Sequence, residues 1–178
     1  MLAFHRRATQ GCVRAERGFT LLELIVTIAI AAILLGIALP SFRGPLDNNR
    51  VAGKASELAG ALSVARAEAL SRGRTVSVCA SADGTSCSAS TAWGAGWIVF
   101  VDGSVIGKVD GTDVVLRVSP AIDAKDALNA SVSAVSFSAQ GMAGATTFTL
   151  KPQSCSANQR RDIVVAATGK VSLRQVAC

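Results

Sequence analysis

Side chains that could act as nucleophiles, bases or metal ligands are few and scattered in this sequence of 178 residues. The only histidine is His5, close to the beginning of the chain. The sequence has no P-loop, no nucleophile paired with a base and no group of acids with metal-ligand spacing. Asp110 and Asp113 flank an expected turn, where acidic residues are common. The sequence therefore predicts a protein that is not an enzyme and that has no metal, no cofactor and no small-molecule substrate.

Cysteine is the one reactive residue type with an informative arrangement. Cys12 lies in a basic N-terminal stretch, and the other four are Cys79, Cys87, Cys155 and Cys178. Four cysteines allow three disulfide connectivities. Local pairing, 79 with 87 and 155 with 178, is the simplest, because each pair flanks a short loop or a terminal hairpin. We expect disulfides formed in an oxidising compartment, and free buried thiols are the alternative.

A single acidic residue interrupts a long apolar run. Residues 19–39 contain only one charge, Glu23, and at about 1.5 Å per residue they extend about 31 Å, enough to span a bilayer core. Residues 1–18 hold four arginines and one glutamate, so the positive-inside rule keeps them cytoplasmic. A carboxylate inside such a run costs about 2.5–3.5 kcal/mol on insertion scales, which makes Glu23 a candidate functional residue. The alternative is that its side chain only reaches up to the lipid headgroups.

After this run the sequence predicts a further helix. Pro40 and the pair Gly44-Pro45 are expected to interrupt the helical pattern. A stripe of small apolar residues then recurs at helical spacing over residues 47–71, and we expect it to be core. Its members are Val51, Ala55, Leu58, Leu62, Ala65 and Ala69.

From residue 74 onward the pattern changes to short, β-branched, alternating segments. Strands are expected at 75–80, 97–101, 104–109, 113–118, 133–138, 146–150, 162–167 and 171–176, with a tight hairpin at Asp102-Gly103. These elements predict an α+β fold in which a long N-terminal helix, half of it transmembrane, packs on an antiparallel β-sheet. The expected organisation is a basic leader at 1–18, a transmembrane and assembly helix at 19–41, and a globular domain at 42–178.

The segment RGFTLLEL, residues 17–24, resembles the class III signal of type IV pilins and type II secretion pseudopilins. The resemblance implies the type IV pilin fold and a cut by a prepilin peptidase between Gly18 and Phe19, followed by methylation of Phe19. Glu23 is the fifth residue after this cut and Pro40 the twenty-second, both where the family places them. In that family the glutamate meets the N-terminal ammonium of a neighbouring subunit during assembly. A buried charge pair is better suited to setting register than to adding stability.

A second segment, WGAGWIVFVD at residues 93–102, resembles the W-x-x-G-W-x-x-F-x-D segment of the FimT, FimU and GspH group of minor pilins and pseudopilins. The matching residues are Trp93, Gly96, Trp97, Phe100 and Asp102. We expect a structural role for them. The alternative is a stacking platform for single-stranded nucleic acid, although no basic residues are interleaved there.

The last 28 residues carry most of the positive charge that remains beyond the leader. The candidate DNA-binding residues are Arg160, Arg161, Lys170 and Arg174. We expect them to lie close together on a hairpin closed by the terminal disulfide, as a patch for phosphates. The region partly resembles a Gly-Arg-x-Arg element that FimT-like pilins use to bind DNA: Gly169 fits, Lys170 replaces the first arginine and Ser172 the second. The alternative is a solvated hairpin that contacts neighbouring subunits.

Together these resemblances imply a minor pilin that primes or caps a type IV pilus at its tip. DNA uptake is left open as an additional activity. The alternatives are an H-type pseudopilin of a type II secretion system and a DNA receptor pilin for natural transformation. The implied partners are other pilin or pseudopilin subunits, the prepilin peptidase and DNA. The implied location is a single-pass protein of the bacterial inner membrane with its C-terminal domain in the periplasm, assembled into a pilus or pseudopilus.

Overall fold

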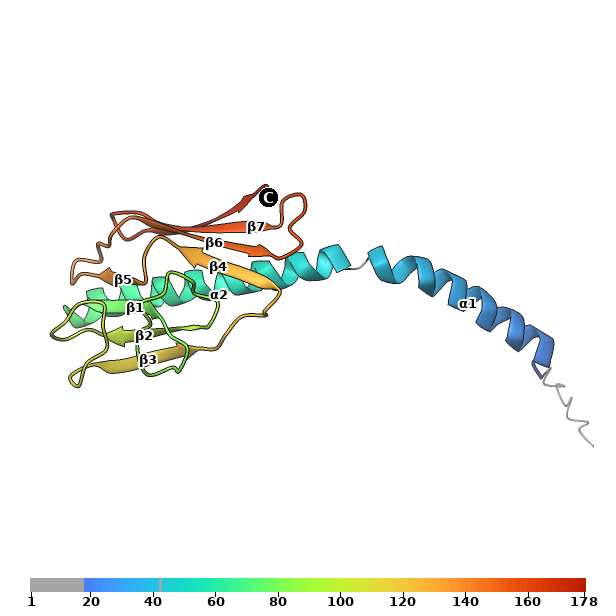
Figure 1. Ribbon diagram of the computed structural model, residues 1–178, viewed down its shortest axis with the longest axis horizontal. Coiled ribbons are helices and arrows are strands. Elements are labelled where there is room, and N and C mark those ends of the chain that lie inside the picture. Colours follow the sequence, from blue (N-terminus) through green and yellow to red (C-terminus); the bar gives the residue numbers. More distant parts are fainter. Residues whose placement is uncertain (1–17, 42) are drawn as a thin grey trace, which may run out of the picture. The chain divides into compact units, whose positions relative to one another are not determined.

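The computed structural model describes residues 18–41 and 43–178, and the chain divides into two compact units at Phe42 (Figure 1). The leader expected at 1–18, with His5 and Cys12, lies outside the described residues except for Gly18.

The first unit contains helix α1, Leu21–Ser41. Thr20 caps it, because its Oγ1 accepts a hydrogen bond from the Glu23 backbone N–H at 3.2 Å. Every large apolar side chain from Phe19 to Leu35 is between 48% and 81% exposed. Within residues 18–41 and 43–178, no helix is both long enough and apolar enough to cross a membrane.

The second unit begins with helix α2, Arg43–Arg72. It starts earlier than predicted, so the expected interruption at Gly44-Pro45 is wrong. Proline is tolerated in the first turn because its missing N–H would have no helical partner there. The predicted apolar stripe is confirmed as core, since all six of its residues are fully buried.

Two four-stranded antiparallel sheets pack against α2 (Figure 1). The first has the order β3-β2-β1-β5, with bounds β1 Val76–Ala80, β2 Trp97–Val101, β3 Val114–Ser119 and β5 Ala134–Phe137. The second has the order β4-β6-β7-β8, with bounds β4 Asp126–Ala130, β6 Thr146–Pro152, β7 Arg160–Val165 and β8 Val171–Val176. The predicted α+β class is confirmed, with two sheets in the place of one.

Two predictions about the strands are wrong. Residues 104–109 form no strand and Asp102-Gly103 forms no tight hairpin, because the connection from β2 to β3 runs irregularly over 102–113. The buried Asp102 carboxylate accepts the Gly107 N–H at 2.6 Å and draws this connection back on itself. Strand β4 was not expected, since its sequence DALNA has no β-branched residue to indicate a strand.

Candidate functional sites and their family

The expected processing junction is open to solvent. Gly18 and Phe19 precede the first turn of α1, and a Cβ built at Gly18 would have no atom within 4 Å. Phe19 is 81% exposed. The Glu23 side chain is also exposed, and its position in the first turn suits the partial positive charge of a helix N-terminus. The junction is therefore accessible to another protein, while cleavage, methylation and the assembly role of Glu23 stay predictions.

The tryptophan segment is interior, so its alternative role as a stacking platform is wrong. Trp93 and Trp97 are both fully buried. Trp93 donates from Nε1 to the Val132 carbonyl oxygen at 2.9 Å. Its ring meets Phe148 of β6 edge to face, with ring centroids 4.7 Å apart. Trp93 therefore joins the loop before β2 to the second sheet.

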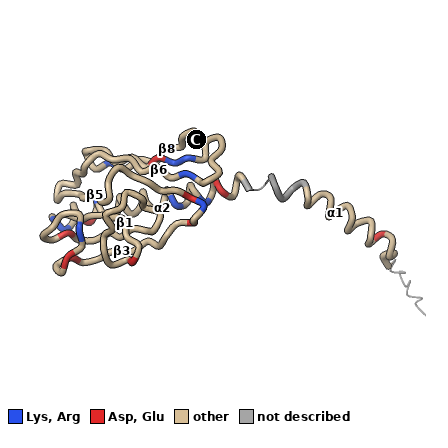
Figure 2. Tube along the Cα trace, viewed as in Figure 1, with Lys and Arg blue, Asp and Glu red and all other residues tan. Residues whose placement is uncertain are grey.

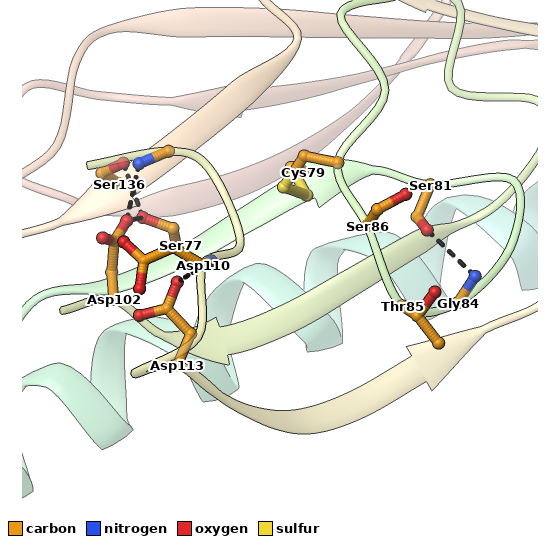
Figure 3. The surroundings of a disulfide bond; sticks show 12 residues. Ser77, Cys79, Ser81, Gly84, Thr85, Ser86, Asp102, Asp110, Asp113 and Ser136 are labelled. Carbon is orange, nitrogen blue, oxygen red and sulfur yellow. Dashed lines mark hydrogen bonds between the residues drawn. A yellow bond between two sulfur atoms is a disulfide. The ribbon is translucent and has the colours of Figure 1, made fainter. Parts of the chain in front are cut away.

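The other matched residues of this segment also have structural roles. Gly96 has φ +117°, and a Cβ there would lie 2.6 Å from the Ser119 carbonyl oxygen, so only glycine fits. Phe100 is fully buried in a small cluster with Cys79 and Ile98. Asp102 accepts a hydrogen bond from Ser77 Oγ at 2.6 Å, as Figure 3 shows.

Both disulfides have the local pairing. Cys79–Cys87 closes a loop next to β1, with Cα atoms 5.6 Å apart, and Cys155–Cys178 joins the β6–β7 connection to the last residue, with Cα atoms 5.8 Å apart. Inside the first loop, hydrogen bonds from Ser86 Oγ and from backbone N–H groups hold the pKa of Asp83 well below its usual range. The loop beside Cys79 appears in Figure 3.

The four basic residues of the C-terminal hairpin do not form one patch. Arg161 is 6% exposed on the face toward α2, where its Nη2 donates to Asn48 Oδ1 at 2.6 Å. Arg160 makes a two-pronged contact with Asp162, at 2.8 and 2.7 Å, which raises the pKa of Arg160. Arg174 stands opposite Asp162 in the β7–β8 register.

Lys170 lies in the turn that joins β7 to β8, whereas Arg160 begins β7 at the other end of the hairpin. The expectation that these residues lie close together is therefore wrong. In Figure 2 the Lys and Arg positions fall at both ends of this unit, with acidic positions beside them. The reason is strand geometry: neighbouring residues face opposite sides, and each residue adds about 3.3 Å along the hairpin.

Gly169 has a backbone reason for being glycine. Its φ is +74°, and a Cβ there would overlap the Gly141 carbonyl oxygen. Arg66 of α2 binds the backbone on both sides of this contact: its Nε donates to the Gly141 carbonyl oxygen and its Nη2 to the Thr168 carbonyl oxygen, each at 3.0 Å. The match of Gly169 to a DNA-binding element is thus also explained by packing.

Sequence reasoning missed a partly buried ion pair near the beginning of α2. Arg50 donates from Nε and Nη2 to the Asp126 carboxylate at 2.9 and 2.7 Å, and the Asp126 side chain is fully buried. This contact raises the pKa of Arg50 and fixes α2 to β4. The only available signal was an arginine one position before the apolar stripe. Among the described residues, no group of three His, Cys, Asp or Glu side chains could hold a metal ion.

Comparisons with known proteins agree with this fold. The FimU type IV minor pilin of Pseudomonas aeruginosa strain PAO1 is 23% identical in two crystal forms. The P21 form covers 71% of this chain and 89% of FimU with a TM-score of 0.57, and the P65 form covers 67% and 89% with a TM-score of 0.52. The minor pseudopilin EpsH from the Type 2 Secretion System of Vibrio cholerae is 12% identical over 72% of this chain and 97% of its own, with a TM-score of 0.47. No curated protein matches the sequence.

Two family models match the sequence itself. The prokaryotic N-terminal methylation motif matches residues 13–39, which include the Gly18-Phe19 junction. The model described as Type II transport protein GspH matches residues 54–169, which is more than half of the chain. The chain therefore belongs to the GspH family of minor pilins and pseudopilins.

Proposed function

We propose that this protein is a minor pilin that enters a type IV pilus through α1 and helps to prime or cap the filament at its tip. The observation that carries the proposal is the surface of α1, which exposes apolar side chains all round in the described turns. A helix that is apolar all round belongs in a membrane or among other helices. Neighbouring α1 helices of a filament would supply that cover. The role is structural, with no catalytic step.

The processing step is the part of the proposal closest to the sequence. A prepilin peptidase would cut between Gly18 and Phe19 and methylate Phe19, and residues 19–41 would hold the subunit in the inner membrane, with residues 43–178 in the periplasm, until it is assembled. The membrane anchor rests on the methylation motif and not on the described helix, which falls short of a membrane span.

Gly18→Leu tests processing without disturbing the fold, because nothing lies within 4 Å of the added side chain's Cβ. We expect the variant to keep its leader, seen by mass spectrometry as an increase equal to the mass of 18 residues. Phe19→Leu is the matched control, since it changes the other side of the same bond and keeps an apolar N-terminal residue. Normal processing of Gly18→Leu, with removal of residues 1–18, would contradict the proposed cut.

The choice of a pilus over a secretion system has less support than the processing step. FimU, whose fold the chain shares, is described as a type IV minor pilin, whereas the matching family model is described as Type II transport protein GspH. The competing function is that of an H-type pseudopilin in a type II secretion system, which would use the same fold and the same junction. A deletion strain scored for twitching, natural transformation and exoprotein secretion separates them: loss of twitching with normal secretion supports the pilus, and the reverse overturns it.

DNA binding is a second candidate function, but fewer residues could carry it than the four that the sequence suggested. With Arg161 buried and Arg160 engaged by Asp162, Lys170 and Arg174 are the exposed cations of the C-terminal hairpin that make no ion pair within the described residues. Two separated cations give a weak electrostatic attraction for phosphates. A salt titration of DNA affinity for Lys170→Ala and Arg174→Ala tests this role, with no DNA binding at low salt as the outcome that removes it.

A further inference from the structure

The two disulfides differ in how far solvent reaches their cysteines. In the first pair, Cys79 is fully buried against apolar side chains of β2, and Cys87 is half-buried. In the terminal disulfide, Cys178 is exposed and Cys155 is half-buried. Of these two pairs, the terminal disulfide is therefore the one that a reactant in solution can meet without a local opening of the fold.

This difference determines which bond an external thiol can break. In thiol–disulfide exchange a thiolate bonds to one sulfur, and the electron pair of the broken S–S bond leaves with the other sulfur as a thiolate. Attack on Cys87 would expel the Cys79 thiolate into an apolar cluster, where the charge has no water around it. Attack on Cys178 expels the thiolate of Cys155, which takes a proton from water. A second external thiolate then releases Cys178, so that two external thiols become one disulfide and both cysteines become thiols.

The terminal disulfide closes the β6–β7 connection, residues 153–159, which is also bound to the end of the chain. The Cys178 N–H donates to the Ala157 carbonyl oxygen at 2.9 Å, and Gln175 Nε2 donates to the Asn158 carbonyl oxygen at 2.7 Å. Figure 1 shows this connection and the C-terminus at the end of the second unit where α2 begins. The disulfide therefore helps to fix the connection beside the first turns of α2.

These first turns of α2 are held by polar contacts. Residues 44–50 include no fully buried side chain. Gln159 Nε2 donates to the Gly44 carbonyl oxygen at 3.3 Å, and Arg161 Nη2 donates to Asn48 Oδ1 at 2.6 Å. Both donors stand at the end of the connection that the disulfide closes, so a movement of the connection reaches α2.

We propose that the terminal disulfide is a thiol-exchange site, opened by a small thiol or a dithiol oxidoreductase in preference to Cys79–Cys87, and that its opening loosens the first turns of α2. The loosening is local, because the ion pair of Arg50 with Asp126 of β4 does not involve the connection. The redox state of the bond thus acts on the part of α2 that follows α1 in the chain. The inference goes beyond the proposed function, since neither entry into a filament nor DNA binding calls for a disulfide that opens.

Selective reduction tests the first half of the proposal. The full chain is purified in detergent as the Cys12→Ser variant, so that the remaining cysteines are those of the two pairs. It is treated with dithiothreitol for increasing times, iodoacetamide blocks the free thiols, and peptide mass spectrometry reports each cysteine. We expect Cys155 and Cys178 to be alkylated at least about tenfold faster than Cys79 and Cys87, a ratio equal to about 1.4 kcal/mol of opening free energy. Equal rates, or earlier alkylation of the buried pair, would overturn the proposal.

Hydrogen exchange tests the second half. The selectively reduced protein is compared with the oxidised one at labelling times at which the core residues 58–65 of α2 stay protected in the oxidised protein. The backbone amides of residues 47–50 should exchange about two- to tenfold faster after reduction, the factor that the loss of one hydrogen bond produces. Replacing Cys155 and Cys178 together by serine should reproduce this effect without reductant, and replacing the other pair should not.

Gln159 separates a specific contact with α2 from a general loss of stability. In the oxidised protein, Gln159→Ala removes the hydrogen bond to Gly44 and should itself accelerate exchange at residues 47–50. Reduction should then add less than it adds in the parent, because the contact is already lost. Gln153→Ala is the matched control, since Gln153 is an exposed glutamine of the same connection whose backbone N–H donates to the Lys125 oxygen, and it should respond to reduction as the parent does.

Unchanged exchange at residues 47–50 after selective reduction would overturn the link to α2. An equal gain of deuterium at residues 58–65 at the same labelling times would show a general loosening and would also overturn it, as would a full effect of reduction in Gln159→Ala. All variants must keep the far-ultraviolet circular dichroism spectrum of the parent. Each of these results leaves the processing at Gly18 untouched, so failure here is distinguishable from failure of the proposed function.

Discussion

The two tryptophans of residues 93–102 form a matched pair for measuring one buried hydrogen bond. Both are fully buried, and substitution of either one by phenylalanine removes the same side-chain atoms. They differ in the indole N–H. Trp93 donates to the Val132 oxygen at 2.9 Å, whereas Trp97 Nε1 has no hydrogen-bond partner among the described residues.

The expected magnitudes follow from that difference. Each substitution leaves a cavity, with a cost of about 2 kcal/mol shared by both variants. Trp93→Phe in addition leaves the Val132 carbonyl without its donor, which costs about 1–2 kcal/mol more. Trp97→Phe removes a buried donor that was not satisfied, so it carries no such penalty. Trp93→Phe should therefore unfold about 3–8 °C below Trp97→Phe for a unit of this size.

Residues 43–178 suit the assay because they contain the entire buried core of the described chain. Unfolding is followed by far-ultraviolet circular dichroism in urea and in thermal scans, with the disulfides kept oxidised in both variants. Equal stabilities, or a lower stability of Trp97→Phe, would refute the hydrogen-bond argument. A Trp93→Leu variant, which also loses the ring contact with Phe148, should be less stable than Trp93→Phe.

Three further predictions concern the loops and the C-terminal hairpin. Arg161→Ala should lower the free energy of unfolding by about 1.5–3 kcal/mol, because a buried, hydrogen-bonded cation is lost. Arg174 is exposed, so Arg174→Ala should change the free energy of unfolding by no more than about 0.5 kcal/mol. Equal effects of the two variants in urea titrations would contradict this difference in burial. Hydrogen bonds from Ser104 and Thr112 lower the pKa of Asp110 to about 2, so its support of residues 102–113 is complete above its ordinary pKa of 3.8 and is lost as the pH falls through about 2. Hydrogen exchange of the backbone amides in this connection should therefore accelerate below about pH 3. In the Asp110→Asn variant the same amides should exchange fast already at pH 7. Amide protection that is unchanged by this substitution would contradict the prediction. Replacing both Cys155 and Cys178 by serine removes a disulfide that closes a loop of 23 residues, and it should lower the free energy of unfolding by about 3 kcal/mol, measured by urea unfolding. An unchanged unfolding midpoint would show that the disulfide does not stabilise the hairpin.

Helix α2 and most strands could be predicted because their signals are local. The apolar stripe of α2 repeats at helical spacing, and all its members are buried. Segments such as WIVFV have the β-branched and aromatic composition of a buried strand, and β2 occupies those five residues. The local disulfide pairing is the simplest of the three connectivities that the sequence left open.

The remaining features depend on contacts between distant segments, which composition does not encode. The strand expected at 104–109 is lost because a buried carboxylate at residue 102 binds the backbone of Gly107. The basic hairpin residues were expected to cluster, but register sends Arg161 toward Asn48 and places Asp162 between Arg160 and Arg174. An apolar pocket lined by Thr75, Ile106, Met142 and Ala167 is formed by connections far apart in sequence, so no single segment could indicate it.

The central claim is that α1 is an assembly helix whose Glu23 sets the register between subunits. The direct measurement is the amount of this protein in sheared, purified filaments, with processing checked by mass spectrometry. Glu23→Gln keeps the size of the side chain and the backbone bond to Thr20 while removing the charge, and Thr27→Val is a matched control on the same helix. The account predicts that Glu23→Gln is processed and stays in the cells but is lost from the filaments, while Thr27→Val is incorporated normally. Normal incorporation of Glu23→Gln would contradict it.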